Sequence, residues 1–349
     1  MALISTLSTQ LTAIELSVNK IYSNGESTLL TIPLDLILTL CPNLKELSVT
    51  VGLCDIQTFA VSQYSNASIT SSLEKLCISD LRLAPAVLEW IIPRCPKIQC
   101  LCVHNMPVEA LTLINQHCPD IKLLGNLSFL YLAPLSTDSS PIDDARKQTG
   151  LKRLEWLYQD ARDGGMLQAL VSLMAKNKDT LAALIFEAMS CTAAFIQSFM
   201  NDAAKIRQYD QLTTLRLRLG KTTSPDISVA VSNFLQRCCM LERVALEIDG
   251  IVSDDFFVSL LYMHHLRDLS LFKLQSFGGL QHFLRHHASI ETKSTLRRLS
   301  ISGCTGMTDV HLHTIAKITT LQTIHLKADG YPDFSDDAIR NFFPGLART

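Results

Sequence analysis

A short phrase of hydrophobic residues recurs along almost the whole chain. It starts with a leucine or isoleucine, and further hydrophobic residues follow at the third and fifth positions after it, as in Leu44-Leu47-Val49. Its twelve occurrences are about 24 to 33 residues apart, a spacing typical of proteins built from a repeated supersecondary unit. The middle positions of the phrases are Ile14, Leu47, Leu76, Leu101, Leu130, Leu154, Leu184, Leu215, Val244, Leu269, Leu299 and Ile324.

Each repeat contains the signals of one strand and one helix. The last two hydrophobic residues of a phrase are two apart and therefore lie on one face of a strand. Between phrases the spacing becomes helical, as from Phe256 to Leu261, and Ser253 and Thr308 stand where helix N-caps are expected. Because one strand and one helix cannot bury their apolar faces alone, stacked units form a parallel sheet with outer helices. The pattern predicts an α/β solenoid of about twelve strand–helix units, in a single domain spanning residues 1–349.

Two stretches depart from the repeat. Residues 133–150, APLSTDSSPIDDARKQTG, contain two prolines and several small polar residues, so we expect a projecting loop there. A tolerated surface insertion explains such a loop, and Ser140-Pro141 leaves a lid or a modification site as the alternative. Near the other end of the chain, residues 335–343 have the pattern of a helix that caps the repeats.

The composition fits a repeat protein with an extensive core. The 349 residues are 47% hydrophobic, yet no uncharged apolar stretch approaches the roughly 18 residues that span a bilayer. The N-terminus has no basic segment ahead of an apolar block, so we expect no secretory signal. The eleven cysteines then indicate reduced thiols in a cytoplasmic or nuclear protein. A net charge of −2 gives no general attraction to polyanions, and we expect neither nucleic acid nor membrane as a partner.

The eleventh repeat carries a more specific signature. It runs from Leu296 through Gly303-Cys304 and Thr308-Asp309 to Ile315-Ala316. This order resembles the cysteine-containing leucine-rich repeat of the F-box/leucine-rich-repeat protein family, in which LxxLxLxxC is followed by a hydrophobic residue, Thr-Asp and LxxLA. The resemblance implies a ribonuclease-inhibitor-like horseshoe with a concave parallel sheet. The family's cysteine three residues before the first leucine or isoleucine also recurs, at Cys41, Cys95, Cys118 and Cys238.

The same resemblance implies a function in protein recognition. In the family, the repeat arc captures a substrate protein, and an N-terminal F-box binds the adaptor subunit of an SCF-type, cullin-based ubiquitin ligase. The first repeat here begins at Leu11, which leaves no room for an F-box, so the ligase adaptor and cullin are expected partners only if an F-box lies upstream. The alternative is a stand-alone leucine-rich-repeat scaffold or inhibitor with no link to a ligase.

Enzyme motifs occur only as fragments. Residues 220–222, GKT, match the end of a phosphate-binding P-loop, but Leu215 stands where the first glycine is required. Residues 282–286, HFLRH, have the histidine spacing of zinc proteases without the glutamate base. We expect no catalytic residues, no cofactor and no bound metal. The expected solvated, histidine-rich outer surface comprises His264, His265, His282, His286 and His287.

The concave face of the predicted sheet is the candidate binding surface. Residues that alternate with the buried phrase positions point into the arc, and in the later repeats they combine aromatic groups with a net basic cluster. We expect a partner segment with acidic or phosphorylated residues beside an apolar anchor. The alternative is that the arginines only solubilise this face and pair with Glu247 and Asp268. The candidate partner-binding residues are Phe129, Tyr131, Glu155, Arg216, Arg218, Arg243, Arg298, His325 and Lys327.

The stretch CPKIQCLCVHN, residues 95–105, has the composition of a metal or reactive-thiol site. The repeat pattern places Cys95 at a helix end, in a structural position. Side chains spaced by about 7 Å along one strand cannot surround one zinc ion alone, and Cys77 on the preceding strand is the only obvious neighbour. We therefore expect solvent-facing thiols on a binding surface rather than a metal site. The residues expected to project from this strand onto the concave face are Cys100, Cys102 and His104.

Overall fold

Strands alternate with helices along the chain, and the fold is α/β. The structure is a computed structural model that describes residues 10–18, 31–51, 58–60, 70–79, 85–104, 106–126, 149–158, 164–222, 225–250, 252–274, 278–303, 306–327 and 334–342. Within these ranges, twelve strands follow one another in a parallel sheet, in the order β1-β3-β5-β6-β7-β8-β9-β10-β11-β12-β13-β14. The prediction of about twelve strand–helix units in an α/β solenoid is confirmed.

The chain divides into two compact units. Unit 1 comprises Met1–Trp156 and Gly165–Leu173, and unit 2 comprises Leu157–Gly164 and Met174–Thr349. In a solenoid each repeat contacts mainly its neighbours, so a single domain can contain two compact groups of repeats. Two such groups therefore do not distinguish one domain from two. The single domain of residues 1–349 therefore stays a prediction.

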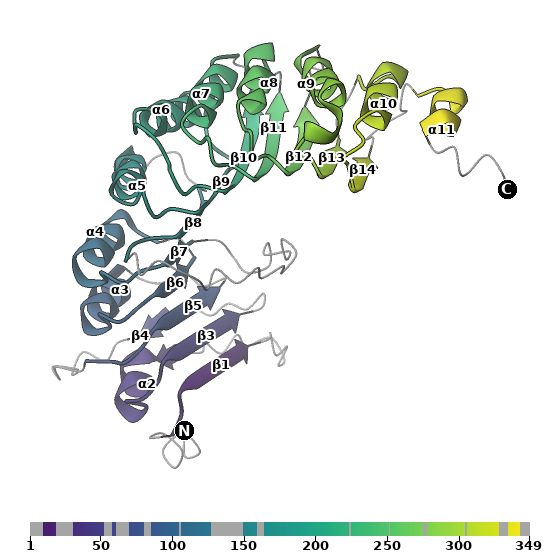
Figure 1. Cartoon of the computed structure of the whole chain (residues 1–349). Coiled ribbons are helices and arrows are strands. Elements are labelled where there is room, and N and C mark those ends of the chain that lie inside the picture. Colours follow the sequence, from purple (N-terminus) through teal and green to yellow (C-terminus); the bar gives the residue numbers. More distant parts are fainter. Residues whose placement is uncertain are drawn as a thin grey trace, which may run out of the picture. The chain divides into compact units, whose positions relative to one another are not determined.

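Unit 1 contains the first strands of the sheet, with helices along one face (Figure 1). The middle positions Leu47, Leu76 and Leu101 pair in register from strand to strand and are completely buried. A separate two-stranded sheet joins β2 to β4. The elements are β1 (Ala13–Val18), β2 (Thr31–Pro33), α2 (Leu34–Leu40), β3 (Glu46–Val51), β4 (Thr58–Ala60), β5 (Lys75–Ser79), α3 (Pro85–Ile91), η1 (Ile92–Arg94), β6 (Cys100–Val103), α4 (Val108–His117), β7 (Leu123–Gly125), β8 (Arg153–Leu157) and α5 (Gly164–Lys176), the last two continuing into unit 2.

The fifth strand lies earlier in the chain than predicted. The phrase centred on Leu130 falls outside the described residues, whereas Leu124 of β7 is buried and pairs with the middle positions of β6 and β8. The turn at Cys118 sets this register, because the Ile121 amide donates a hydrogen bond to the Cys118 carbonyl at 3.3 Å. The preceding repeat has the same bond at its own cysteine. The cysteine before the strand, and not the richer hydrophobic run after it, marks this repeat.

Unit 2 continues the same pattern, with helices along one face of its strands (Figure 1). Its middle positions pair in register from Leu184 to Ile324; the first five are buried and Ile324, in the last strand, is exposed. The predicted capping helix near residues 335–343 is present as α11. The elements are β9 (Ala183–Ala188), α6 (Ala193–Ala204), β10 (Thr214–Thr222), α7 (Pro225–Leu235), β11 (Arg243–Gly250), α8 (Asp254–Leu261), β12 (Asp268–Leu274), α9 (Gly278–Ser289), η3 (Glu291–Lys293), β13 (Arg298–Ser302), α10 (Asp309–Ala316), β14 (Thr323–Lys327) and α11 (Asp336–Phe342).

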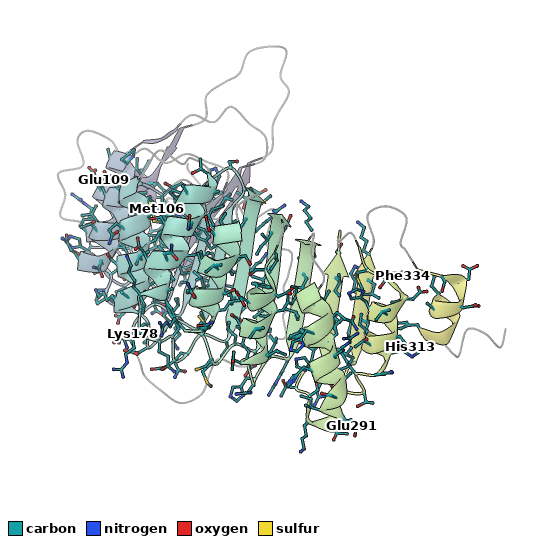
Figure 2. The ribbon with its side chains drawn as sticks, turned by 90° about the horizontal axis from the view of Figure 1, so that it is seen from above. Met106, Glu109, Lys178, Glu291, His313 and Phe334 are labelled. Atoms are coloured by element: carbon teal, nitrogen blue, oxygen red, sulfur yellow. The ribbon has the colours of Figure 1, made fainter. Side chains whose placement is uncertain are left out.

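Helices α8 and α10 begin where the sequence predicts, and outer positions of the helices carry exposed polar residues. Ser253 and Thr308 are the N-caps of α8 and α10, and the Thr308 amide donates to His311 Nδ1 at 3.2 Å. Outer positions such as Glu109 of α4 and His313 of α10 are exposed (Figure 2). In the described part of the chain, no helix is both long enough and apolar enough to cross a bilayer.

Candidate functional site

The face of the sheet opposite the helices, here called the open face, carries the candidate site. Its residues alternate with the buried middle positions, and in unit 2 the strand register aligns them in three rows across β9 to β14. The first row is Ala183, Thr214, Arg243, Asp268, Arg298 and Thr323; the second is Ile185, Arg216, Ala245, Ser270, Ser300 and His325; the third is Glu187, Arg218, Glu247, Phe272, Ser302 and Lys327.

Two carboxylates and three cations form a connected network on this face. Glu187, which is only 3% exposed, lies 3.7 Å from the Arg216 guanidinium and 3.6 Å from that of Arg218. Glu247 approaches Arg218 Nε at 2.8 Å and Lys273 Nζ at 2.9 Å. Both arginine side chains keep about a third of their surface accessible. The network therefore holds the guanidinium groups in place while leaving them accessible to a partner.

Further along the sheet the basic residues differ in how they are paired. Arg298 donates from Nε and a terminal nitrogen to both oxygens of Asp268, a bidentate pair at the surface. Arg243, His325 and Lys327 have no carboxylate within ion-pair distance among the residues that the structure describes. Arginines thus pair with Glu247 and Asp268, as the alternative interpretation of this face expected. Among the described residues, this pairing leaves Arg243 and Lys327 without a compensating carboxylate.

The structure brings six of the nine candidate residues together. Arg216, Arg218, Arg243, Arg298, His325 and Lys327 all lie on the open face of unit 2. Glu155 lies on β8 in unit 1, 3% exposed and ion-paired with Arg153, so its carboxylate is already engaged. Phe129, Tyr131 and most of the loop predicted at 133–150 lie outside the described residues.

Three members of the network were absent from the candidate residues, although Glu247 was expected as a pairing partner of the arginines. Glu187 alternates with the buried positions of β9, so the repeat pattern could have identified it as the central carboxylate. Lys273 has the opposite alternation, and it reaches Glu247 from a backbone with φ of 60°. A left-handed residue of this kind gives no signal in the hydrophobic pattern. Phe272, half-buried beside Glu247 in the third row, is an aromatic group of the described open face.

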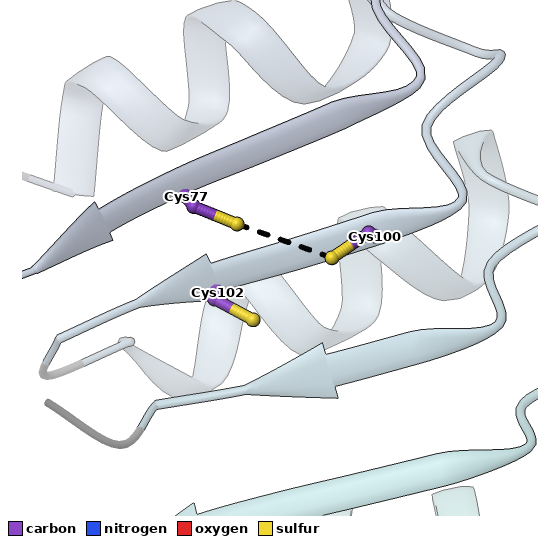
Figure 3. A group of neighbouring side chains, drawn as sticks. All are labelled: Cys77, Cys100 and Cys102. Atoms are coloured by element: carbon purple, nitrogen blue, oxygen red, sulfur yellow. Dashed lines mark hydrogen bonds between the residues drawn. The ribbon is translucent and has the colours of Figure 1, made fainter. Parts of the chain in front are cut away.

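The thiols of unit 1 are less accessible than expected. Cys77, Cys100 and Cys102 lie on the open face, as the strand pattern predicts, but they cluster (Figure 3). Cys102 is 8% exposed and Cys77 is 2% exposed, so the expectation of solvent-facing thiols is wrong for Cys102 and holds in part for half-buried Cys100. The reason is that the neighbouring strand places Cys77 directly beside Cys102. His104 follows the end of β6 in a turn, while Cys95 is buried at the end of η1 as predicted.

The structure also shows where the expected histidine-rich surface and the P-loop fragment lie. His264, His265, His282 and His286 are exposed as expected, but His287 is buried on α9 and hydrogen-bonds through Nδ1 to Ser294 at 2.9 Å. Burial, and then the neighbouring His286, lowers the pKa of His287 to about 4. The helical period explains this correction, because position 287 belongs to the same face as buried Phe283 and Leu284. Residues 220–222 end strand β10 and form no phosphate-binding loop.

Comparison with known proteins adds no identification. No protein-family model matches the chain, and no curated protein matches it. The resemblance of the eleventh repeat to F-box/leucine-rich-repeat proteins therefore rests on the sequence motif, and the site is interpreted from its own geometry.

Proposed function

We propose that the protein is a non-catalytic recognition module that binds a partner protein through the open face of unit 2. The main support is the arrangement of cations on one rigid sheet: guanidinium groups fixed by Glu187 and Glu247, next to basic residues that lack carboxylate partners in the described part of the chain. Solenoids commonly bind partners on such an extended face. Groups that are already ordered lose less conformational entropy on binding, which favours affinity.

The chemistry of the face selects an acidic or phosphorylated partner segment. The three rows contain Arg216, Arg218, Arg243, Arg298 and Lys327 against Glu187, Glu247 and Asp268, so basic groups exceed carboxylates. Arginine binds carboxylate and phosphate oxygens with two parallel hydrogen bonds. Phe272 offers a neighbouring apolar contact for an anchor residue of the partner.

A pair of charge-reversal variants tests this proposal. Arg243→Glu combined with Lys327→Glu changes two basic residues that have no carboxylate partner among the described residues, so the fold should be retained. Affinity purification from cell lysate should lose a saturable partner found with the unmodified protein, with the melting temperature unchanged. Arg237→Glu combined with Arg285→Glu makes the same change in net charge at exposed positions after α7 and on α9. This control should keep the partner; equal binding by both variants would contradict the proposal.

The same purification separates the two wider roles. Substrate selection for an SCF-type ligase, as the family resemblance implies, requires the ligase adaptor and cullin among the recovered proteins, together with an F-box encoded upstream. Stable partners without adaptor or cullin favour the stand-alone scaffold or inhibitor. Sequencing the 5′ end of the transcript determines independently whether an F-box is encoded.

A further inference from the structure

Three cysteine sulfurs converge on the open face of unit 1, apart from the charged face proposed to bind a partner. Cys77 comes from β5, and Cys100 and Cys102 come from β6 (Figure 3). The strands pair Cys77 with Cys102, and Cys100 lies two residues earlier on the same face. The sulfurs all lie within 4.8 Å of one another, with 4.0 Å between those of Cys77 and Cys100. Three potential thiolate ligands thus surround one point.

The size of the triangle fits one metal ion. A thiolate sulfur lies about 2.3 Å from a bound zinc ion, so three sulfurs in a trigonal plane around one ion are about 4.0 Å apart. The separations of up to 4.8 Å then require each sulfur to move inwards by only about 0.5 Å. Small side-chain rotations suffice for this movement, and the strand register need not change.

The three thiols differ in pKa: the surroundings favour the thiolate of Cys100, whereas the pKa of Cys102 is raised, first by its hydrogen bond with Cys100. The pKa of Cys100 is lowered, first by hydrogen bonds from Cys102 and Cys77 and further by the positive charges of Lys75 and Arg153. The hydrogen bond with Cys100 is also the largest of the effects that raise the pKa of Cys77. Metal binding replaces these shared protons by one central cation, so it releases the protons of Cys77 and Cys102.

The three sulfur donors limit which metal ions the site can bind. Among the described residues, no further histidine, cysteine or carboxylate joins the three sulfurs. Thiolate sulfur selects soft ions such as copper(I) and zinc(II), and zinc adds a fourth ligand where the protein supplies three. Gly125 of β7 lies next to Cys102, and a Cβ added there would approach its sulfur at 3.4 Å. The missing side chain leaves space beside the sulfur, and half-buried Cys100 gives access from solvent.

We propose that Cys77, Cys100 and Cys102 bind one soft d10 metal ion, copper(I) or zinc(II), through three thiolates. The site crosslinks β5 to β6 on the face opposite the described helices of unit 1. It is independent of the proposed partner surface, because the two use different strands and different chemistry.

Metal titration of the full chain tests the site. The protein is reduced, freed of metal under anaerobic conditions and titrated with copper(I)–acetonitrile complex or with zinc(II) against a chromophoric competitor. One ion should bind per chain, and Cys100→Ser should weaken this binding by at least about 100-fold, since loss of even an outer-shell partner costs 10- to 100-fold. X-ray absorption should show three sulfur ligands with copper(I), or three sulfurs and one lighter atom with zinc(II).

Controls keep a folding defect separate from loss of the site. Cys100 is the primary variant because it is the least buried of the three, and circular dichroism of its metal-free form reports the fold. Cys239→Ser, at an exposed cysteine of unit 2, should leave the stoichiometry at one. Bound metal should also protect Cys100 from alkylation while Cys239 stays reactive. Three outcomes would each overturn the proposal. The chain binds no metal at a 1:1 ratio, folded Cys100→Ser binds with equal affinity, or two of the three cysteines form a disulfide in the freshly reduced protein.

Discussion

The open faces of the two units share one architecture and differ in chemistry. In both, buried aliphatic residues alternate with outward positions in continuous register. In unit 1 the outward positions of β5 to β7 bring together Cys77, Cys100, Cys102 and Gly125, which are small and mostly buried. In unit 2 the equivalent positions hold arginines that reach solvent and carboxylates, such as Glu187, that are largely buried. The buried positions thus determine the fold, while the alternating positions are free to acquire different chemistry.

The largest effects should come from the feature that the two units share. Leu101→Ala in unit 1 and Leu215→Ala in unit 2 each remove a side chain that is at most 1% exposed. Each should lower the free energy of unfolding by about 2–5 kcal/mol, because the lost burial is accompanied by a cavity. Denaturant unfolding followed by circular dichroism measures both. A cost below about 1 kcal/mol at Leu101 alone would show that unit 1 is not packed like unit 2.

This shared feature is also the part that the sequence predicts best. Period two within a phrase and its recurrence every 24 to 33 residues identify the strand positions without reference to distant contacts. The register confirms eleven of the twelve predicted middle positions. The fifth fails because the run around Leu130 is more hydrophobic than the short strand at Leu124. Hydrophobicity ranks segments by apolar content, whereas the hydrogen-bonded turn at Cys118 determines where the strand begins.

The candidate sites depend on neighbours that are remote in sequence. The alternation places the arginines of unit 2 on the open face, but it does not show that Glu187 is buried between two of them. Likewise, the spacing along one strand does not by itself place Cys100 and Cys102 around a metal ion, and the third sulfur comes from Cys77 on β5. Side-chain directions follow from the strand period, while distances and burial follow from the packing of adjacent strands.

Acid should weaken unit 2 through one buried histidine. His287 has a pKa of about 4 in the folded protein against an ordinary 6.5, so its contribution to stability is present above pH 6.5 and is lost as the pH falls towards 4. The loss should reach roughly 3 kcal/mol at most. His287→Gln should flatten the decline in melting temperature between these pH values.

A matched variant on the same helix controls for this effect. His282→Gln changes an exposed histidine of α9 and should keep the full pH dependence. An unchanged acid response in folded His287→Gln would place the sensitivity elsewhere in the chain.

In the described part of the chain, each unit has one buried carboxylate on its open face, and the stability lost on removing its charge can be compared between the units. Glu187→Gln leaves Arg216 and Arg218 without their shared anion, whereas Glu155→Gln leaves only Arg153. Because these arginines remain partly in water, we expect losses of roughly 2 kcal/mol at Glu187 and roughly 1 kcal/mol at Glu155. Thermal unfolding of both variants at neutral pH and in raised salt gives the measurement. Equal losses would mean that the Glu187 network is no more connected than a single pair.

The smallest change in stability should come from the ion pair between Arg298 and Asp268 on the open face. Arg298 and Asp268 form a bidentate pair, but nearly half of the Arg298 side chain is exposed, so Asp268→Asn should cost less than about 1 kcal/mol. At the same time the substitution removes the negative charge that lies between Arg243 and Arg298 in the first row, and it makes the face more basic. If this face binds an acidic partner, Asp268→Asn should strengthen binding about two- to fivefold at low salt, with the gain vanishing at high salt. Weaker binding with unchanged stability would instead assign Asp268 to direct contact with the partner.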